Sequence, residues 1–155
     1  MTPMKLVDVT YDHLLHVLRN LREADRQEIN ATAWDESPEA HAERLLAVSG
    51  GSWIALVDDV PVAAGGGVCA WPGMWSMWMI ATPDFDKCAL SVTRFAKKDM
   101  IPALKQQGAR RLQCHTLDTH KQSQAWLEAL GAKYESTLHN YGKNGETFYC
   151  FSWVF

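Results

Sequence analysis

The first part of the chain changes from one hydrophobic period to another, and each period predicts a different element. In "MKLVDVT", residues 4–10, apolar and polar positions alternate as they do in a half-buried strand. In "YDHLLHVLRNLREADRQEI", residues 11–29, leucines recur at helical spacing, with Asp12 placed as an N-cap. A second helix is predicted from Ser37, its cap, to the glycine pair at 50–51.

The middle of the chain has the pattern of strands. "SWIALVDD" and "VPVAAGGGVCAW" flank a short turn and predict a β-hairpin. Its glycine triplet, residues 65–67, predicts a bulge or the close approach of another backbone segment. "MWSMWMIA", residues 74–81, is apolar at both parities, which predicts a central strand covered on both faces.

The second half alternates helices with strands. A helix is expected over residues 89–108, kinked or divided by Pro102. A strand follows at 110–117, then a helix ended by Gly131, then strands at 133–141 and 146–155. The predicted order is β-α-α-β-β-β-α-β-α-β-β, which indicates one mixed α/β domain over residues 1–155.

Composition and charge narrow the function classes. The chain has 155 residues, 47% of them hydrophobic, and a formal net charge of −3, which argues against nucleic-acid binding. No apolar run is long enough to cross a membrane, and the amino terminus does not resemble a signal peptide. Four scattered cysteines without a C-x-x-C pair are expected to be buried and reduced, which favours a cytoplasmic protein without disulfides or a metal site.

The stretch "TPDFDKCALS", residues 82–91, joins the predicted central strand to the helix after it. Backbone N–H groups at a helix start, together with the helix dipole, form an anion site in many proteins. The structural alternative is a helix N-cap that only joins the strand to the helix and binds no ligand.

Two stretches in this element order resemble the Gcn5-related N-acetyltransferase (GNAT) family, and the resemblance extends over residues 4–155. "MIATPDFDKCALSVTRFAKKDMIPAL" looks like the family's fourth strand, pyrophosphate loop and following helix. "LDTHKQSQAWLEALGAKYE" looks like its "N-x-x-A…LGF" segment, with His120 at the asparagine position and Ser123 at the alanine position. The resemblance implies a GNAT-like α/β fold.

The resemblance also implies where acetyl-CoA would bind, in a gap between the fourth and fifth strands. Pantetheine would pair with the backbone of the fourth strand, and N–H groups near its end would polarise the thioester carbonyl. The residues implied for pantetheine are Trp78, Met79, Ile80 and Ala81, and those for the diphosphate are Asp86, Lys87, Cys88, Ala89, Leu90 and Ser91.

The sequence departs from the family pattern at the loop and at the general acid. The loop pattern Arg/Gln-x-x-Gly-x-Gly/Ala places Asp86, Ala89 and Ser91 at its defined positions. Alanine and serine are small enough for a phosphate to approach, whereas the Asp86 carboxylate could bond the same amides or repel the diphosphate. The position of the family's tyrosine acid is Leu127.

The expected activity is acyl-CoA-dependent N-acyl transfer, from acetyl-CoA to a primary amine by direct attack in a ternary complex. Glu28 and His115 are the candidate bases, although a solvated helix end and a core histidine are the structural alternatives. The sequence leaves the acceptor open among a small amine, an antibiotic, a peptide terminus and a lysine.

A weaker resemblance connects the chain to short GNAT-like proteins of T7-like phages. It implies an alternative, in which a catalytically inactive protein serves as a virion component or host-interaction module, in the host cytoplasm or the virion. The oligomeric state is left as monomer or homodimer, the dimer forming through the apolar final strand "FYCFSWVF".

Overall fold

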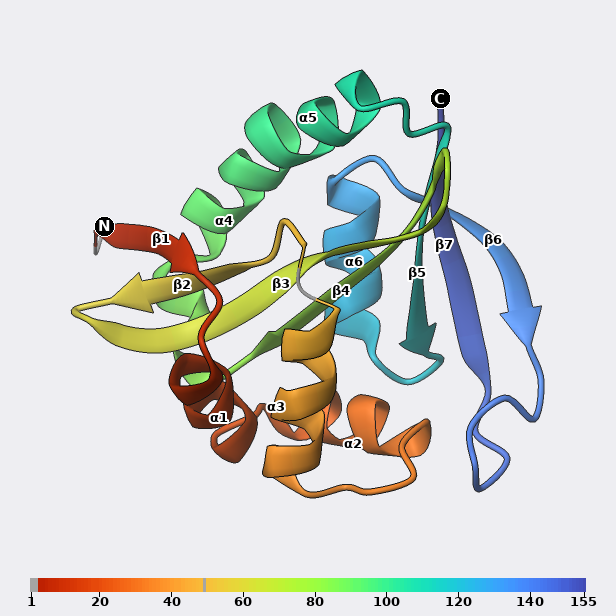
Figure 1. The fold of residues 1–155 in the computed structure, drawn as a ribbon. Helices are drawn as coiled ribbons and strands as arrows, with labels where there is room; N and C mark the ends of the chain where they lie inside the picture. Colours follow the sequence, from red (N-terminus) through yellow and green to blue (C-terminus); the bar gives the residue numbers. More distant parts are fainter. Residues whose placement is uncertain (1–2, 49) are drawn as a thin grey trace.

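A computed structural model describes residues 3–48 and 50–155. Seven strands form one mixed sheet in the order β1-β2-β3-β4-β5-β7-β6 (Figure 1). The strands are β1 (Met4–Asp8), β2 (Trp53–Val57), β3 (Val60–Trp71), β4 (Met74–Ala81), β5 (Arg111–Leu117), β6 (Lys133–Leu138) and β7 (Phe148–Val154). The predicted mixed α/β class is confirmed, and the seven strands follow one another along the chain as predicted.

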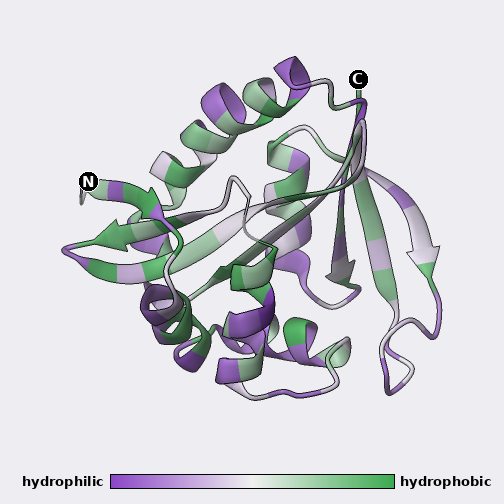
Figure 2. Ribbon diagram, viewed as in Figure 1, coloured by the Kyte–Doolittle hydropathy of each residue, from purple (hydrophilic) through white to green (hydrophobic). Residues whose placement is uncertain are grey.

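Helices cover both faces of the sheet (Figure 1). They are α1 (Tyr11–Arg19), α2 (Glu23–Ala31), α3 (Pro38–Ala47), the 3₁₀ turn η1 (Pro83–Lys87), α4 (Ala89–Phe95), the π-helical turn η2 (Ala96–Met100), α5 (Ile101–Gln106) and α6 (Lys121–Ala129). Helices α1 and α3 pack on one face of the central strands, while α4, α5 and α6 pack on the other. Figure 2 shows the strands at the centre as mainly hydrophobic and the helices as mixed, as a two-faced sheet requires.

The segment predicted as one helix over residues 11–29 is two helices, α1 and α2. The chain leaves the helix at Asn20, whose side-chain amide caps the carbonyl of His16 at 2.7 Å. The break allows the Arg22 N–H to donate to the Ala81 carbonyl, 3.0 Å away at the end of β4. The predicted cap is also wrong, because Thr10 rather than Asp12 accepts the first-turn amide.

The helix predicted around Pro102 is divided, as expected. Helix α4 passes into the π-helical turn η2, and α5 begins immediately before the proline. Proline has no N–H to give to the preceding turn, and a π-turn absorbs the missing hydrogen bond without ending the helix.

The glycine triplet at 65–67 serves close packing and is not a bulge. A Cβ on the first glycine would lie 2.5 Å from the Trp53 ring, and on the second 2.8 Å from the Ser52 Cα. The pairing irregularities of β3 fall elsewhere, near residues 55–56 and 69–71. Only glycine allows these strands and the Trp53 ring to approach so closely.

Strands β4 and β5 are parallel and separate along their length. They pair only from Met74–Arg111 to Ser76–Gln113. Beyond that point β4 continues to Ala81 and β5 to Leu117 without facing each other, and Figure 1 shows the two strands diverging below their contact. The sheet therefore contains an opening bordered by two unpaired strand edges.

Two expectations about the surface are wrong. β7 lies between β5 and β6, so the final strand has a neighbour on both sides and no free edge for a second copy. Cys69 is exposed, because the end of β3 projects beyond the helices that cover its middle. The other three cysteines are buried or partly buried, and all four are free thiols.

Candidate functional site

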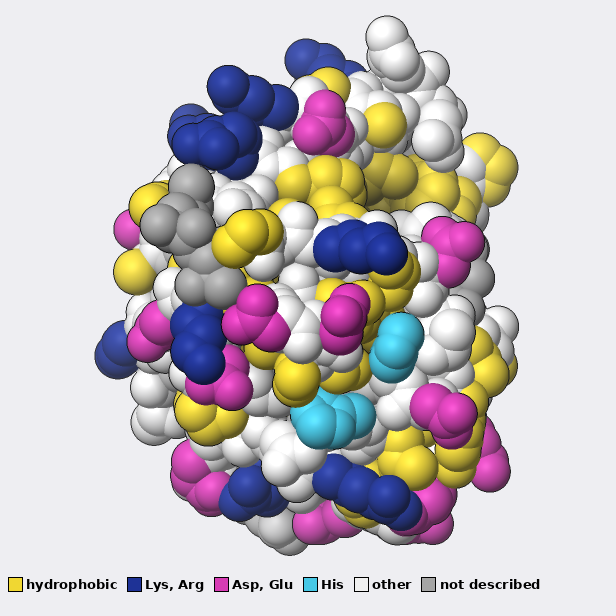
Figure 3. Space-filling model, turned by 90° about the vertical axis from the view of Figure 1, so that its left-hand side faces the viewer, with side chains coloured by type: hydrophobic (Ala, Val, Ile, Leu, Met, Phe, Trp, Pro, Cys, Tyr) yellow, Lys and Arg dark blue, Asp and Glu magenta, His cyan; other side chains and the backbone are white. Residues whose placement is uncertain are grey.

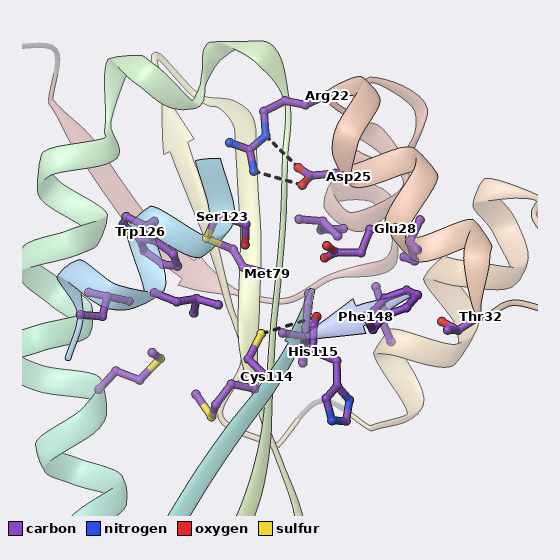
Figure 4. A pocket seen from close by; sticks show the side chains of 18 of the residues that line it. Arg22, Asp25, Glu28, Thr32, Met79, Cys114, His115, Ser123, Trp126 and Phe148 are labelled. Atoms are coloured by element: carbon purple, nitrogen blue, oxygen red, sulfur yellow. Dashed lines mark hydrogen bonds and ion pairs between the residues drawn. The ribbon is translucent and has the colours of Figure 1, made fainter. Parts of the chain in front are cut away.

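A cavity of about 240 Å³ occupies the opening between β4 and β5 (Figure 4). Its walls come from α2 and α3 on one face of the sheet, from η2, α5 and α6 on the other, and from β4 and β5 between them. Among the predicted site residues, those that line it are Glu28, Trp78, Met79, Ile80, His115 and Ser123. The structure thus gathers residues that are far apart in the sequence.

The backbone edge of β4 offers one amide to the cavity where sequence analysis implied several. Thr82 N–H donates to Val62 of β3, and Ala81 N–H turns the other way, to the Asp25 carboxylate at 2.9 Å. Because successive amides of a strand alternate, those of Trp78 and Ile80 face β3, whereas Met79 faces the opening. With Ile80 in the ladder and Ala81 already bonded to Asp25, Met79 is the amide near the end of β4 that faces the opening.

Helix α2 holds the ends of both separated strands. Asp25, 3% exposed, accepts from Ala81 and forms a bidentate ion pair with Arg22 at 2.8 and 3.1 Å. Glu28 Oε2 accepts the N–H of Leu117, the last residue of β5, at 2.9 Å. Figure 4 shows both carboxylates extending from α2 toward the opening.

His120 connects these two carboxylates. Its Nδ1 lies 2.9 Å from Glu28 Oε2, and its Nε2 lies 3.5 Å from Asp25 Oδ1. The ring is buried at the start of α6 and does not line the cavity. This histidine, at the position where the resemblance places an asparagine, therefore links α6 to α2.

His115 lines the α1–α3 side of the cavity. Its Nδ1 lies 3.4 Å from the Tyr141 hydroxyl, and its Nε2 has no partner among the residues described. Partial burial, followed by the charge of Arg111, holds the pKa of His115 below its ordinary value. The imidazole is therefore neutral near neutral pH and can accept a proton. Tyr134 packs against Tyr149 and Phe151 outside the cavity.

The predicted diphosphate loop lies at the head of α4. Residues 83–87 form η1, and Cys88 begins α4 without a side-chain cap, so the first amides of the helix have no partner from this residue. Within the described part of the chain, the exposed Asp86 carboxylate forms no hydrogen bond or ion pair and does not cap them. Residues 86–91 lie outside the cavity lining.

Basic side chains accompany this loop. Arg94, Lys97 and Lys98 are exposed on α4 and η2. On the face shown in Figure 3, Lys and Arg side chains gather at the top, the level at which Figure 1 shows α4 and α5. The positions fit either a phosphate contact or a solvated helix face.

Helix α6 closes the other side of the opening. Ser123, at the family's alanine position, and Leu127, at its tyrosine position, both line the cavity. Trp126 donates its indole N–H to the Thr93 hydroxyl of α4 at 2.8 Å and packs edge-on against Phe85. No hydroxyl replaces the missing tyrosine at position 127.

Sequence reasoning missed several cavity residues. Arg22, Arg44, Trp53 and Phe148 line it but stand in segments whose patterns indicate only amphipathic elements. The motif "READ" was a possible signal, since arginine and aspartate at i, i+3 meet on a helix. Nothing in the sequence indicates that Arg44 faces the cavity.

Neither metal ligation nor a membrane span is found in the residues described. No group of three or more His, Cys, Asp or Glu side chains at 3–48 and 50–155 is arranged to hold a metal ion. None of the helices described has both the length and the apolar character needed to cross a bilayer.

No protein-family model and no curated protein sequence matches the chain. Solved structures do match it over nearly its whole length. An acetyltransferase of the GNAT family from Bacillus anthracis matches with a TM-score of 0.72 at 10% identity, over 99% of this chain and 96% of that one. The ribosomal-protein-S18-alanine N-acetyltransferase of Escherichia coli matches with a TM-score of 0.71 at 13% identity, over 98% and 94%.

A third similar structure, yncA of Salmonella typhimurium, was solved with its cofactor acetyl-CoA; the TM-score is 0.70 at 10% identity, over 99% of this chain and 94% of that one. These three proteins are bacterial, and they lend no support to the phage resemblance. At such identities the similarity is one of fold. The chain therefore has the GNAT fold, and its cavity lies where β4 and β5 separate.

Proposed function

We propose that this chain is an acyl-CoA-dependent N-acyltransferase that transfers an acetyl group from acetyl-CoA to a primary amine. The main observation in support of this function is the opening between β4 and β5, where an unpaired strand edge borders a cavity. Structural neighbours with this fold include the ribosomal-protein-S18-alanine N-acetyltransferase and yncA, which was solved with acetyl-CoA. Acetyl-CoA supplies an activated acyl group as its thioester.

The residues of this chain fit an extended thioester ligand in two ways. The Met79 amide faces the opening from a strand edge that has no neighbour, so it can donate to a carbonyl oxygen. Neither the Asp86 carboxylate nor the Cys88 side chain caps the head of α4, so the Ala89 and Leu90 amides can face a diphosphate. Ala89 and Ser91 add little bulk at that point.

His115 is the base that the geometry favours. A neutral imidazole with a free Nε2 can take one proton from the substrate ammonium, which gives the nucleophilic amine, and Tyr141 holds its other nitrogen. The free amine then attacks the carbonyl carbon, the carbon–sulfur bond breaks, and the nitrogen loses its second proton to water as it becomes the amide. With Leu127 at the acid position, the departing thiolate takes its proton from water, and catalysis depends chiefly on positioning.

The alternative is an interaction protein that has lost CoA binding, and one observation favours it. The Trp126 indole is hydrogen-bonded to Thr93, bridges α4 and α6, and lines the cavity. A ligand that passes between these two helices would have to displace this bridge.

Thermal unfolding with acetyl-CoA separates the two functions. A ligand at 100 times its Kd stabilises the native state by about 2.7 kcal/mol, which raises the Tm of a chain of this size by several degrees. We expect such a shift at millimolar acetyl-CoA and none with ATP at the same concentration. An unchanged Tm, with no CoA retained through purification, would favour the interaction protein.

An Asp86→Asn variant tests the loop. One carboxylate about 4 Å from a phosphate costs about 1 kcal/mol in water, so the variant should bind acetyl-CoA several-fold more tightly, and less so at high salt. Asp59→Asn, in the β2–β3 turn, removes the same charge far from the loop and should change nothing. Equal affinity of the Asp86 variant and the unmodified protein would contradict a diphosphate at this loop.

A further inference from the structure

Arg44 is a cation at the cavity without a carboxylate partner. It lies on α3, lines the cavity, and has no carboxylate within 4 Å among the residues described. Arg22, which lines the same cavity, is neutralised by Asp25. A guanidinium without a counter-ion beside a cavity is suited to an anionic group of a ligand, above all a carboxylate.

The Arg44 side chain is held in place by a neutral histidine. One guanidinium nitrogen lies 2.5 Å from His41 Nδ1, and His41 Nε2 lies 2.8 Å from Asn30 Oδ1. A guanidinium can only donate, so Nδ1 accepts and Nε2–H donates to the Asn30 amide oxygen. Burial, followed by the charge of Arg44, lowers the pKa of His41, which keeps the ring neutral and in this role.

The same cavity carries proton acceptors without partners. Glu28 Oε2 is bonded to Leu117 and His120, but Oε1 has no partner in the described part of the chain. His115 Nε2 is likewise unbonded there. An ammonium group can donate to both. The cavity thus offers a positive group on α3 and proton acceptors on α2 and β5.

Apolar side chains also line this cavity, among them Ile29, Leu45, Trp78 and Phe148. The Trp78 indole N–H is buried and has no hydrogen-bond acceptor among the residues described, which leaves a second donor on the side of the sheet that α3 covers. A ligand that satisfies these groups carries an anionic group, an ammonium group and an apolar side chain.

We propose that the acceptor is a zwitterionic amine, an α-amino acid with an apolar side chain, whose carboxylate is bound by Arg44 while its amine is placed at Glu28 and His115. The proposal rests on the acyltransferase function proposed above and names its acceptor. It excludes the other acceptor classes by charge, because a lysine side chain or a peptide amino terminus has no free carboxylate beside its amine.

Initial rates with matched acceptors test the proposal. Release of the CoA thiol from acetyl-CoA would be followed with L-leucine, L-methionine and L-phenylalanine, each beside its primary amide and its decarboxylated amine. Loss of a charged hydrogen bond lowers affinity by about tenfold or more, so kcat/KM should be at least that much higher for the acids. In the Arg44→Gln variant, kcat/KM for the acids should fall to the value for the amides, and kcat/KM for the amides should change little.

Arg19→Gln is the matched control, because it removes one exposed arginine charge from α1 outside the cavity and should leave every rate as it was. Amides acylated as fast as acids by the unmodified protein would overturn the proposal. So would an Arg44→Gln variant that keeps the Tm of the unmodified protein and loses activity on all acceptors alike, since Arg44 would then not act through the carboxylate.

Calorimetry separates failure of this inference from failure of the function. Acetyl-CoA binding without a preference for the acids overturns the acceptor assignment and leaves the acyltransferase standing. Arg44-dependent binding of the three acids by a protein that does not bind acetyl-CoA overturns the acyltransferase, and with it the role of the acid as acceptor. Binding of none of the acids, at millimolar concentration, overturns the proposal outright.

Discussion

His115 shows how a residue's surroundings select its chemistry. The alternation of β5 places its ring on the face opposite Cys114, and there burial and the nearby Arg111 both disfavour the imidazolium form. The pKa of His115 therefore lies below its ordinary value of 6.5. Between the two values, the unfolded chain binds a proton that the folded chain does not, so acidification through this range destabilises the fold.

The same shift predicts the pH dependence of catalysis. Because a base must be unprotonated, kcat/KM for acyl transfer should fall on the acid side with a midpoint below 6.5. His115→Gln should remove that limb and lower the rate on the order of 10²-fold or more. The measurement is a pH–rate profile.

His139, exposed and outside the cavity, provides the matched control: His139→Gln should keep both the rate and the acid limb. An acid limb that persists in His115→Gln belongs to another group and would contradict the role assigned to this ring.

Single residues could be predicted from the sequence only where a pattern constrains them. Ser37 caps α3 as predicted, because capping is a local geometry, and Gly131 ends α6 with a positive φ of 95°. Arg44 could not be predicted, since a charged residue on a short amphipathic helix has the same pattern whether it meets water or a cavity. The Asp25–Ala81 hydrogen bond spans 56 positions and leaves no trace in local sequence.

At the scale of elements, α2 determines the shape of the opening. Helix α2 supplies the carboxylates that accept the N–H groups of Ala81 at the end of β4 and Leu117 at the end of β5. In a continuous sheet these N–H groups would bond to the neighbouring strand. The strands can separate without leaving buried amides unpaired at their ends. Periodicity predicted the strands but not this helix, because the break at residues 20–22 has no proline or glycine to announce it.

The Asp25 contact should therefore dominate the stability contributed by α2. Asp25→Ala leaves the Arg22 guanidinium and the Ala81 N–H without their buried partner, and breaking such a pair costs about 3–5 kcal/mol. Arg26→Ala removes an exposed ion pair with Glu23 on the same helix and should cost about 1 kcal/mol or less. Urea unfolding measures both.

Hydrogen exchange adds a local readout to that comparison. The Ala81 amide should exchange faster in Asp25→Ala but not in Arg26→Ala, because only the first variant removes its acceptor. If the two variants lose the same stability, α2 does not hold the end of β4.

At the scale of the whole molecule, the fold has been kept while the motif residues have changed. The GNAT arrangement matches solved structures at 10–13% identity over almost the entire chain, although the loop has no glycine and the acid position holds leucine. Backbone amides and strand edges provide the features that define this fold, and they survive side-chain replacement. The resemblance could therefore be recognised from element order and two motifs.

The cysteines give a test of this packing across the molecule, because each lies in a different region. Burial raises the pKa of Cys88 to about 11 and raises the pKa values of Cys114 and Cys150, while Cys69 is exposed at the end of β3. The thiolate is the reactive form, so in the native protein near neutral pH only Cys69 should react quickly with a thiol reagent. Stopped-flow titration should show one fast thiol in buffer and four in denaturant, and Cys69→Ser should remove the fast phase.

A second fast thiol would contradict this packing and identify which region opens: Cys88 reports the α4 core, Cys150 the sheet, and Cys114 the cavity wall. Only in the last case should acetyl-CoA suppress the reaction, so the same titration connects the packing of the whole molecule to the occupancy of its site.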